Sequence, residues 1–280
     1  MTLQNLYQKI AQYQAKGIDM VLVTATEKEG EGPVEVGKKM LVCESGEFFG
    51  TVGGGALEHY AIEKAKKLIK SRTHLTEKYL LDKGKVIDQT VTLPMVCGGK
   101  VTLYYEFIGY KNYVYIFGGG HVGQALARVL KPLQFHLTMI DERDHIVEKF
   151  EDADVTYHEK FADFIKEKGI KDNSLVVVCT PSHTHDYHVI NTILAMKFKP
   201  KYVGMMCSLE KLKDYLQATY ATFGKEIDLS FFYSPIGLDL GGGSPEEIAI
   251  SIASELLVIE HEKQGHLHMR DKNHDDTHYW

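Results

Sequence analysis

Residues 113–123 read YVYIFGGGHVG, and a helical pattern, VGQALARVL, follows directly to residue 130. An apolar strand that runs into G-x-G-x-x-G at the start of a helix is the fingerprint of a Rossmann βαβ unit. In such a unit Gly118 permits the tight turn, Gly120 lets a pyrophosphate approach the backbone, and Gly123 allows the helix to pack closely on the strand. The free amides of the first helical turn would bind the phosphate. This stretch therefore predicts a nucleotide-binding Rossmann domain.

Further polar residues follow the next strands and complete the expected site. Asp141 ends the apolar segment HLTMID, 23 residues after Gly118, where a Rossmann acid accepts hydrogen bonds from a ribose diol. Asp141 would repel a 2′-phosphate whereas Arg143 would attract one, so NAD and NADP both stay open. A vestigial Rossmann domain that binds no ligand is the structural alternative. The expected cofactor-binding residues are Gly118, Gly119, Gly120, His121, Val122, Gly123, Asp141, Arg143, Thr180 and His183, and no residue is assigned a catalytic or metal-binding role.

Composition restricts the class of protein. The 280 residues include 32 Lys and Arg and 38 Asp and Glu, a formal net charge of −6, which argues against sequence-blind binding to nucleic acid. No apolar run reaches the ~20 residues of a membrane span, and the N-terminus lacks the order of a signal peptide. The four cysteines are far apart and form no C-x-x-C, so neither a disulfide framework nor a structural zinc site is expected. We therefore expect a cytoplasmic protein that contacts neither nucleic acid nor membrane.

The pattern of strands and helices changes near residues 109–112. Before that point the pattern predicts an α+β domain over residues 1–110 with a mainly antiparallel sheet. After it, continuous apolar strands alternate with helices, which predicts a doubly wound parallel sheet over residues 111–262. Residues 263–280 are expected to form a solvated, His-rich tail. The fold class is therefore α/β, with a C-terminal Rossmann-like domain and an N-terminal α+β domain.

Hydrophobic periodicity and capping signals place the individual elements. Ser244 suits the N-cap of the last helix, Pro245 its first turn, and Glu247 completes a capping box. The triplet Gly241–Gly243 before it is another potential anion cradle, although the acids of the first turn oppose an anion. A loop is expected over 27–37. Other helices are expected near 3–16, 56–70, 121–131, 184–196 and 208–221, and strands near 20–24, 39–43, 48–52, 75–81, 86–92, 100–108, 113–117, 135–140, 154–157, 175–179 and 202–206.

A histidine-rich segment, SHTHDYH at residues 182–188, allows three interpretations. Imidazole and carboxylate groups are good metal ligands, so a metal site is one of them. The segment follows an apolar strand, at the edge where a doubly wound sheet binds ligands, which favours lining of the nucleotide pocket. His183 is then the best candidate. In the third interpretation Thr184 and Asp186 merely start a helix.

Four stretches of the chain belong together as a pattern: KKMLV followed by GTVGGGALE (38–58), VCGG (96–99), FGGGHVGQALA followed by MIDER (117–143), and SPIGLDLGGGSPEEIAISIASELL (234–257). With them the chain resembles the xanthine dehydrogenase accessory protein family, XdhC/CoxI, along nearly its whole length. The last stretch is the most specific, because ordinary dinucleotide-binding domains lack it. The chain departs from the family at Ala56, where a Cys is frequent, and at TPSH (180–183) and CSLEK (207–211), which lack the family's arginines.

The resemblance implies an accessory protein, or chaperone, for the maturation of molybdenum hydroxylases rather than a catalyst. Such a protein binds the molybdenum cofactor (molybdopterin), aids its sulfuration and delivers it to the target enzyme. The cofactor, or its phosphate-bearing part, is then expected between the two domains, with phosphate near Gly118–Gly123 and the metal end near Cys97. The implied partners are a xanthine dehydrogenase-like molybdenum hydroxylase and a cysteine desulfurase, and a homodimer stays open.

The cysteines are assigned one by one. Cys97, which matches the family's CGG motif and joins the expected cofactor-binding residues, is either a thiolate that contacts molybdenum or carries sulfur, or a buried small apolar residue. Cys43, Cys179 and Cys207 lie within or just after apolar strands. We expect all three to lie in the core.

Two functions of other classes stay open. An NAD(P)-dependent oxidoreductase would use the same glycine loop, but the sequence shows no acid–base pair for hydride transfer at a recognisable spacing. A nucleotide-sensing module would bind its ligand without turnover. Binding of the molybdenum cofactor, turnover with NAD(P)H, or ligand binding alone would distinguish the three functions.

Overall fold

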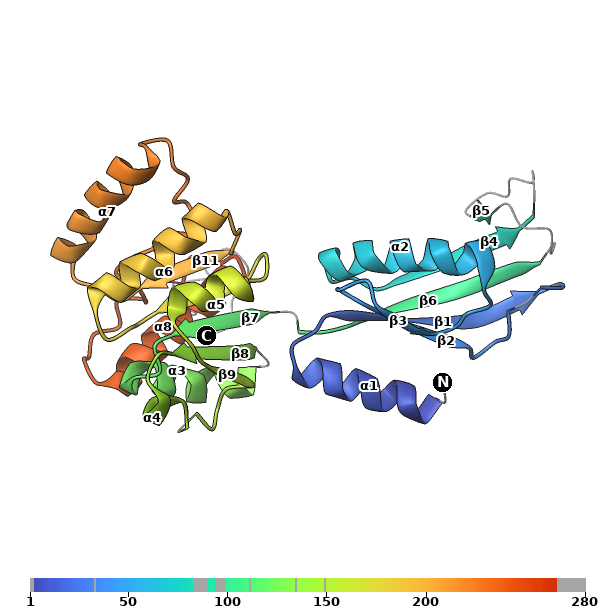
Figure 1. The fold of residues 1–280 in the computed structure, drawn as a ribbon, viewed down its shortest axis with the longest axis horizontal. Coiled ribbons are helices and arrows are strands. Elements are labelled where there is room, and N and C mark those ends of the chain that lie inside the picture. The colour runs from blue at the N-terminus through green and yellow to red at the C-terminus, as the bar shows by residue number, and fades with distance from the viewer. Residues whose placement is uncertain are drawn as a thin grey trace, which may run out of the picture. The chain divides into compact units, whose positions relative to one another are not determined.

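The structure of the protein is a computed structural model that describes residues 3–32, 34–82, 90–93, 99–110, 112–133, 135–148 and 150–265. The chain divides into two compact units, residues 1–111 and 112–280, each with its own hydrophobic core (Figure 1). The first unit is α+β and the second is Rossmann-like, so the fold class predicted from the sequence is confirmed. Among the described residues, no helix has the length and apolar character needed to cross a membrane.

The N-terminal unit is built on a six-stranded sheet with the order β3-β2-β1-β6-β4-β5, in which only β4 and β5 pair in parallel. Successive residues of β1 face opposite sides of this sheet. Val21 and Val23 pack in the same cluster as Ala61 of α2, whereas Leu22 packs with Leu6 of α1, so a helix covers each face (Figure 1). The elements are α1(Leu3–Ala15), β1(Met20–Glu29), β2(Lys39–Cys43), β3(Phe48–Gly50), α2(Gly55–Ser71), β4(Leu75–Leu81), β5(Val91–Leu93) and β6(Lys100–Ile108).

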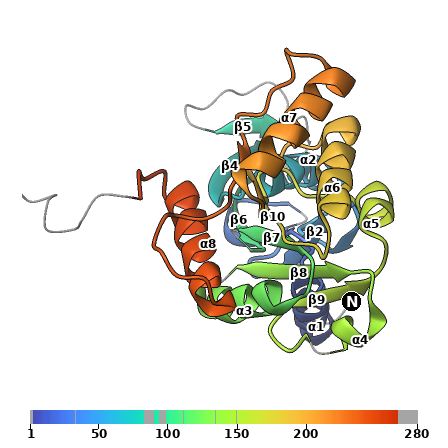
Figure 2. The same ribbon diagram turned by 90° about the vertical axis from the view of Figure 1, so that its left-hand side faces the viewer.

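The C-terminal unit contains a six-stranded sheet with the order β12-β11-β10-β7-β8-β9, and all its neighbouring strands are parallel. This is the strand order of a Rossmann fold, in which the chain changes direction between β7 and β10 and ligands bind beyond the carboxyl ends of these strands. Helices α3 and α8 lie against one face, and α5 and α6 against the other (Figure 2). The elements are β7(Tyr113–Phe117), α3(His121–Leu130), η1(Lys131–Leu133), β8(His136–Asp141), α4(Asp144–Val147), β9(Val155–His158), α5(Phe161–Glu167), β10(Leu175–Val178), α6(His183–Met196), β11(Tyr202–Met205), α7(Leu209–Phe223), β12(Phe232–Tyr233) and α8(Pro245–Glu260).

The structure corrects several expected element boundaries. The loop predicted over 27–37 begins only at Gly30, because β1 continues to Glu29 and pairs with β6 beyond a register shift between Ala25 and Glu27. The expected strand at 86–92 appears as β5, Val91–Leu93, and residues 83–89 lie outside the described part of the chain. The sequence pattern does not predict η1, α4, α5 or β12, which are short or lack a clear apolar period.

Two helix starts test the capping signals. Ser244 caps α8: its hydroxyl accepts a hydrogen bond from the Glu247 amide and the Glu247 carboxylate accepts one from the Ser244 amide, so the predicted capping box is confirmed. Helix α6 is capped by Ser182, one residue before its first residue, and neither Thr184 nor Asp186 is the cap. Asp186 is instead buried inside the first turn.

Candidate functional site

The glycine loop, residues 118–123, joins β7 to α3 at the carboxyl edge of the parallel sheet. Gly118 has φ +109°, and a Cβ there would lie 2.4 Å from the Cys179 carbonyl oxygen. A Cβ on Gly123 would lie 2.1 Å from the Gly118 carbonyl oxygen. Both positions therefore need glycine for the packing of the protein itself.

Gly120 differs from the other two motif glycines. Its backbone is extended, with φ −66° and ψ −170°, a conformation that any residue adopts. A Cβ at this position would meet nothing within 4 Å. Neither strain nor internal packing explains the glycine, and the open space above it is where the motif lets a phosphate approach the backbone.

The first turn of α3 presents uncapped amides. Gly120 is its N-cap without a side-chain cap, and no acidic residue lies in the first turn. Within the described residues no hydrogen bond reaches the amides of residues 120–123, whereas the next amide, Gln124, donates to the Gly120 carbonyl oxygen at 3.0 Å. Uncapped amides and the positive end of the helix dipole together favour an anion.

The other glycine-rich start in this unit is already occupied by the chain. At Gly241–Gly243, the Oε2 atom of Glu247 accepts hydrogen bonds from the amides of Gly243 and Ser244, at 3.0 and 2.9 Å. These bonds hold the pKa of the Glu247 carboxyl below its ordinary value. The potential anion cradle of α8 is therefore filled by a carboxylate of its own first turn.

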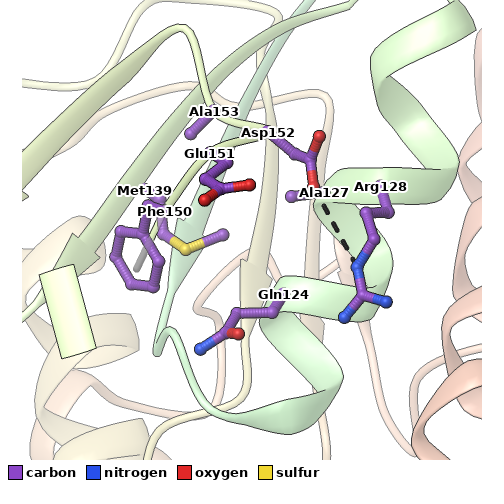
Figure 3. A pocket seen from close by; sticks show the side chains of 8 residues that line it. All are labelled: Gln124, Ala127, Arg128, Met139, Phe150, Glu151, Asp152 and Ala153. Carbon is purple, nitrogen blue, oxygen red and sulfur yellow. Dashed lines mark ion pairs between the residues drawn. The ribbon is translucent and has the colours of Figure 1, made fainter. Parts of the chain in front are cut away.

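Side chains from neighbouring elements fix the glycine loop from the other side. A Cβ on Gly119 would lie 1.7 Å from Cζ of Phe150, so this ring covers the middle of the loop. Gln124 donates through Nε2 to the Gly119 carbonyl oxygen at 2.8 Å. Gln124 and Phe150 also line a cavity of about 370 Å³ beside α3, which the Arg128–Asp152 ion pair at 4.0 Å borders on its other side (Figure 3). Neither Gln124 nor Phe150 was expected from the sequence, because no part of the motif specifies them.

Asp141, at the end of β8, is fully buried and bonded within the protein. Its Oδ2 accepts from the Gly119 amide at 2.7 Å and from Nη2 of Arg143 at 2.8 Å. Its Oδ1 accepts from the amide and from Nε of Arg143, both at 2.9 Å. Burial by itself would raise the pKa of Asp141, but the hydrogen bonds from the Arg143 side chain and from the two amides outweigh it and hold the pKa below its usual range. Asp141 thus ties β8 to the glycine loop as a carboxylate.

Thr180 and His183 lie on the β10–α6 turn, next to Gly118. The Thr180 amide and hydroxyl both donate to Oδ1 of Asp186, at 3.0 and 2.6 Å, and Thr180 is buried. Burial raises the pKa of Asp186, and the bonds from Thr180 only partly offset this. His183 is exposed at the start of α6, and its ring meets Tyr187 edge to face at 5.8 Å between centroids. The turn places His183 at the carboxyl edge of the sheet, while Thr180 is held by its own contacts.

The histidine-rich segment does not converge on one point. In the part of the chain that the structure describes, no three His, Cys, Asp or Glu side chains are grouped so that they could hold a metal ion. Asp186 turns inward to Thr180, and His185 packs edge to face against Phe161 at 5.8 Å. The segment therefore contributes a helix cap, a buried carboxylate and the exposed His183.

The cysteines divide into buried and accessible thiols. Cys43 and Cys179 are buried, as predicted, and burial is the main factor that raises the pKa of Cys43 to about 11 and that of Cys179 to about 12. The expectation that Cys207 lies in the core is wrong, because it is partly exposed after β11, with Sγ 3.0 Å from the Ser234 hydroxyl. Cys97, expected near the metal end of the cofactor, lies outside the described residues.

This fold and loop define a Rossmann-type domain with an uncapped phosphate-binding turn. Residues 114–256 match the model of the XdhC Rossmann domain, and residues 13–79 match the model of the XdhC and CoxI family. The chain belongs to this family, as the sequence motifs predict.

Similar proteins extend beyond this chain in length. It is 23% identical over 270 residues to the uncharacterized protein YqeB of Escherichia coli, covering 95% of this chain and 48% of that protein. It is 27% identical over 144 residues to a probable subunit of xanthine dehydrogenase from Bacillus subtilis, covering 51% of this chain and 41% of that protein. The chain thus spans less than half of each of these relatives. A crystal structure of a xanthine dehydrogenase from Bacillus halodurans shares the fold, with a TM-score of 0.50, 21% identity, and 95% and 98% of the two chains covered.

Proposed function

We propose that this chain is an accessory protein for a xanthine dehydrogenase-like molybdenum hydroxylase. It binds the molybdenum cofactor through the phosphate, aids its sulfuration and insertion, and acts in the cytoplasm with the hydroxylase and a cysteine desulfurase as partners. Membership of the XdhC and CoxI family and the likeness to a probable subunit of xanthine dehydrogenase support this assignment.

One observation of the structure carries the binding part of the proposal. Gly120 needs to be glycine neither for its backbone angles nor for packing, and four consecutive amides beside it have no hydrogen-bond partner among the described residues. A terminal phosphate presents several acceptor oxygens to such a turn. The glycine loop is therefore the place for the phosphate of the pterin, and the chain needs no catalytic residue for this role.

The test uses a variant that fills the open space without disturbing the fold. Gly120→Ala should leave the thermal unfolding midpoint within about 2 °C of the native value, because Ala suits the observed backbone angles. The same variant should weaken binding of molybdopterin by at least about tenfold, because the added methyl group occupies the approach to the amides. Binding is measured anaerobically on the reduced full chain, from the fluorescence of the oxidised pterin that remains bound.

Gly243→Ala is the matched control, since a Cβ on Gly243 also meets nothing within 4 Å but the local amides already bond to Glu247. It should bind molybdopterin like the native chain. A native protein that binds no molybdopterin contradicts the proposal, and turnover of NAD(P)H with an alcohol or acid would instead establish the oxidoreductase. Unchanged binding by Gly120→Ala would place the phosphate elsewhere.

A further inference from the structure

The hydrogen bonds of Asp141 decide what this site can recognise. An ionised carboxylate has about four lone-pair sites for hydrogen bonds. All four are filled from within the chain, by the Gly119 amide, the Arg143 amide and two N–H groups of the Arg143 side chain. The Asp141 side chain is also 0% exposed. A ribose diol therefore finds no acceptor on Asp141 while the Arg143 side chain stays in place.

Arg143 is the group that remains available at this point. Its guanidinium carries five N–H donors, of which Asp141 engages two. The side chain is 36% exposed. Because the Gly119 amide and Nη2 of Arg143 bond to the same carboxylate oxygen, at 2.7 and 2.8 Å, these nitrogens lie within the sum of those distances, about 5.5 Å.

We propose that Arg143, oriented by Asp141, binds a phosphate monoester of the ligand, so that the site selects a terminal phosphate over a ribose diol or a phosphodiester. The proposal rests on the phosphate-binding role of the glycine loop given above. A guanidinium held by two parallel hydrogen bonds keeps its remaining donors in a fixed plane, which suits the oxygens of a phosphate. A monoester offers three unsubstituted oxygens and a diester only two, so the monoester can bond to more of these donors.

Two ligands contain this chemistry, and the experiment separates them. NADPH and NADH differ only in the 2′-phosphate monoester. Molybdopterin ends in a phosphate monoester, whereas in molybdopterin cytosine dinucleotide that phosphate is a diester. Dissociation constants are measured for all four with the reduced full chain, by nicotinamide fluorescence for the first pair and by bound pterin for the second.

The expected result is that the monoester binds at least about tenfold more tightly in one of the two pairs. A preference in the first pair identifies a dinucleotide 2′-phosphate as the source, and a preference in the second identifies the pterin phosphate. Arg143→Gln should reduce that preference to less than about threefold. Arg128→Gln removes the same charge from α3, at a side chain paired with Asp152 rather than Asp141, and should keep the preference.

Arg143→Gln leaves a buried carboxylate short of donors, so its unfolding curve is recorded with the binding data. If it does not fold, Arg143→Lys, which keeps the charge but loses the paired geometry, should show a smaller preference than the native chain. Binding without a monoester preference in either pair, or a full preference in a folded Arg143→Gln protein, overturns this inference and leaves the proposed function in place. Absence of binding by all four ligands overturns both.

Discussion

Asp141 and Asp186 are buried carboxylates in the same unit, and their surroundings act on them in opposite directions. Asp141 receives four hydrogen bonds, two of them from a guanidinium, and its pKa is lowered. Asp186 receives two, both from the neutral Thr180, and burial raises its pKa. The number and charge of the donors therefore decide whether burial favours or disfavours the carboxylate.

The Asp141 carboxylate should make folding sensitive to acid. Since its folded pKa lies below the ordinary value of about 3.9, its contribution to stability is fully present above about pH 4 and is lost as pH falls through the folded pKa. Asp141→Asn removes this contribution. At pH 7 we expect the variant to lose about 3 kcal/mol of unfolding free energy, the lower end for a buried ion pair because Arg143 is partly solvated. Urea unfolding between pH 7 and pH 3 measures both effects.

Asp186→Asn is the control with the opposite sign. A raised folded pKa means that the folded state binds more protons than the unfolded chain between about pH 4 and that pKa, so native Asp186 adds stability as pH falls. The variant keeps an acceptor for Thr180 and loses this gain. It should therefore be more sensitive to acid than the native chain, and Asp141→Asn less. Equal pH slopes in all three proteins would contradict the assignment.

The residues around the loop mark the limit of what the sequence could predict. The motif located the loop, because glycine spacing between a strand and a helix reports backbone requirements that hold in any Rossmann fold. It placed Asp141 correctly at the end of β8, but the filling of its acceptors depends on the Arg143 rotamer, which no spacing records. Cys207 was misplaced for a similar reason, since exposure after a buried strand depends on how α7 and the segment at Ser234 fold over it.

At the scale of elements, α3 and α8 show two uses of a glycine-rich start. Both helices follow glycine triplets at the same edge of the sheet and pack against each other. Helix α8 has Glu247 in its first turn, and this carboxylate satisfies the local amides, whereas α3 has no acid there. The presence of an acid in the first turn therefore separates a structural cap from a potential anion site.

The capping box of α8 should be a measurable part of stability. Ser244→Ala removes the hydroxyl that accepts from the Glu247 amide, and we expect a loss of about 0.5–2 kcal/mol of unfolding free energy. Ser254→Ala on the same helix is the control: its hydroxyl bonds only to the Ile250 carbonyl oxygen of the preceding turn, so the change should stay within about 0.5 kcal/mol. Urea unfolding at pH 7 measures both. Equal losses would show that the cap adds nothing specific.

Long elements with a clear period were predictable, and those that depend on a partner were not. The strands at 75–81 and 113–117 were predicted with their observed bounds, because apolar residues and turn signals define them locally. The end of β1 was missed because Glu27, Lys28 and Glu29 are strand residues only through pairing with β6, where Glu29 meets Lys100 at 3.2 Å. Cross-strand partners can thus override a Gly-, Glu- and Pro-rich composition.

At the scale of the whole molecule, the chain has two cores with no shared residue. One cluster joins residues from Val21 to Tyr105, including the large side chains Tyr79 and Tyr105, whose hydroxyl oxygens lie 2.6 Å apart. The other joins residues from Val114 to Leu256 and holds β7, α3 and α8 together. The strand, loop and helix that form the phosphate turn all belong to the second cluster. Each unit therefore has the packing that independent folding requires.

This separation predicts that residues 112–280 fold and bind without the first unit. The fragment should unfold cooperatively in urea, because its sheet and its covering helices are complete within it. Its affinity for the phosphate ligand identified with the full chain should stay within about threefold, since Gly120, Asp141 and Arg143 bond only within this unit. The fragment with Gly120→Ala is the control and should fold but bind at least about tenfold more weakly. A folded fragment that has lost binding would show that residues 1–111 supply part of the site, and the phosphate turn alone would then not explain the affinity.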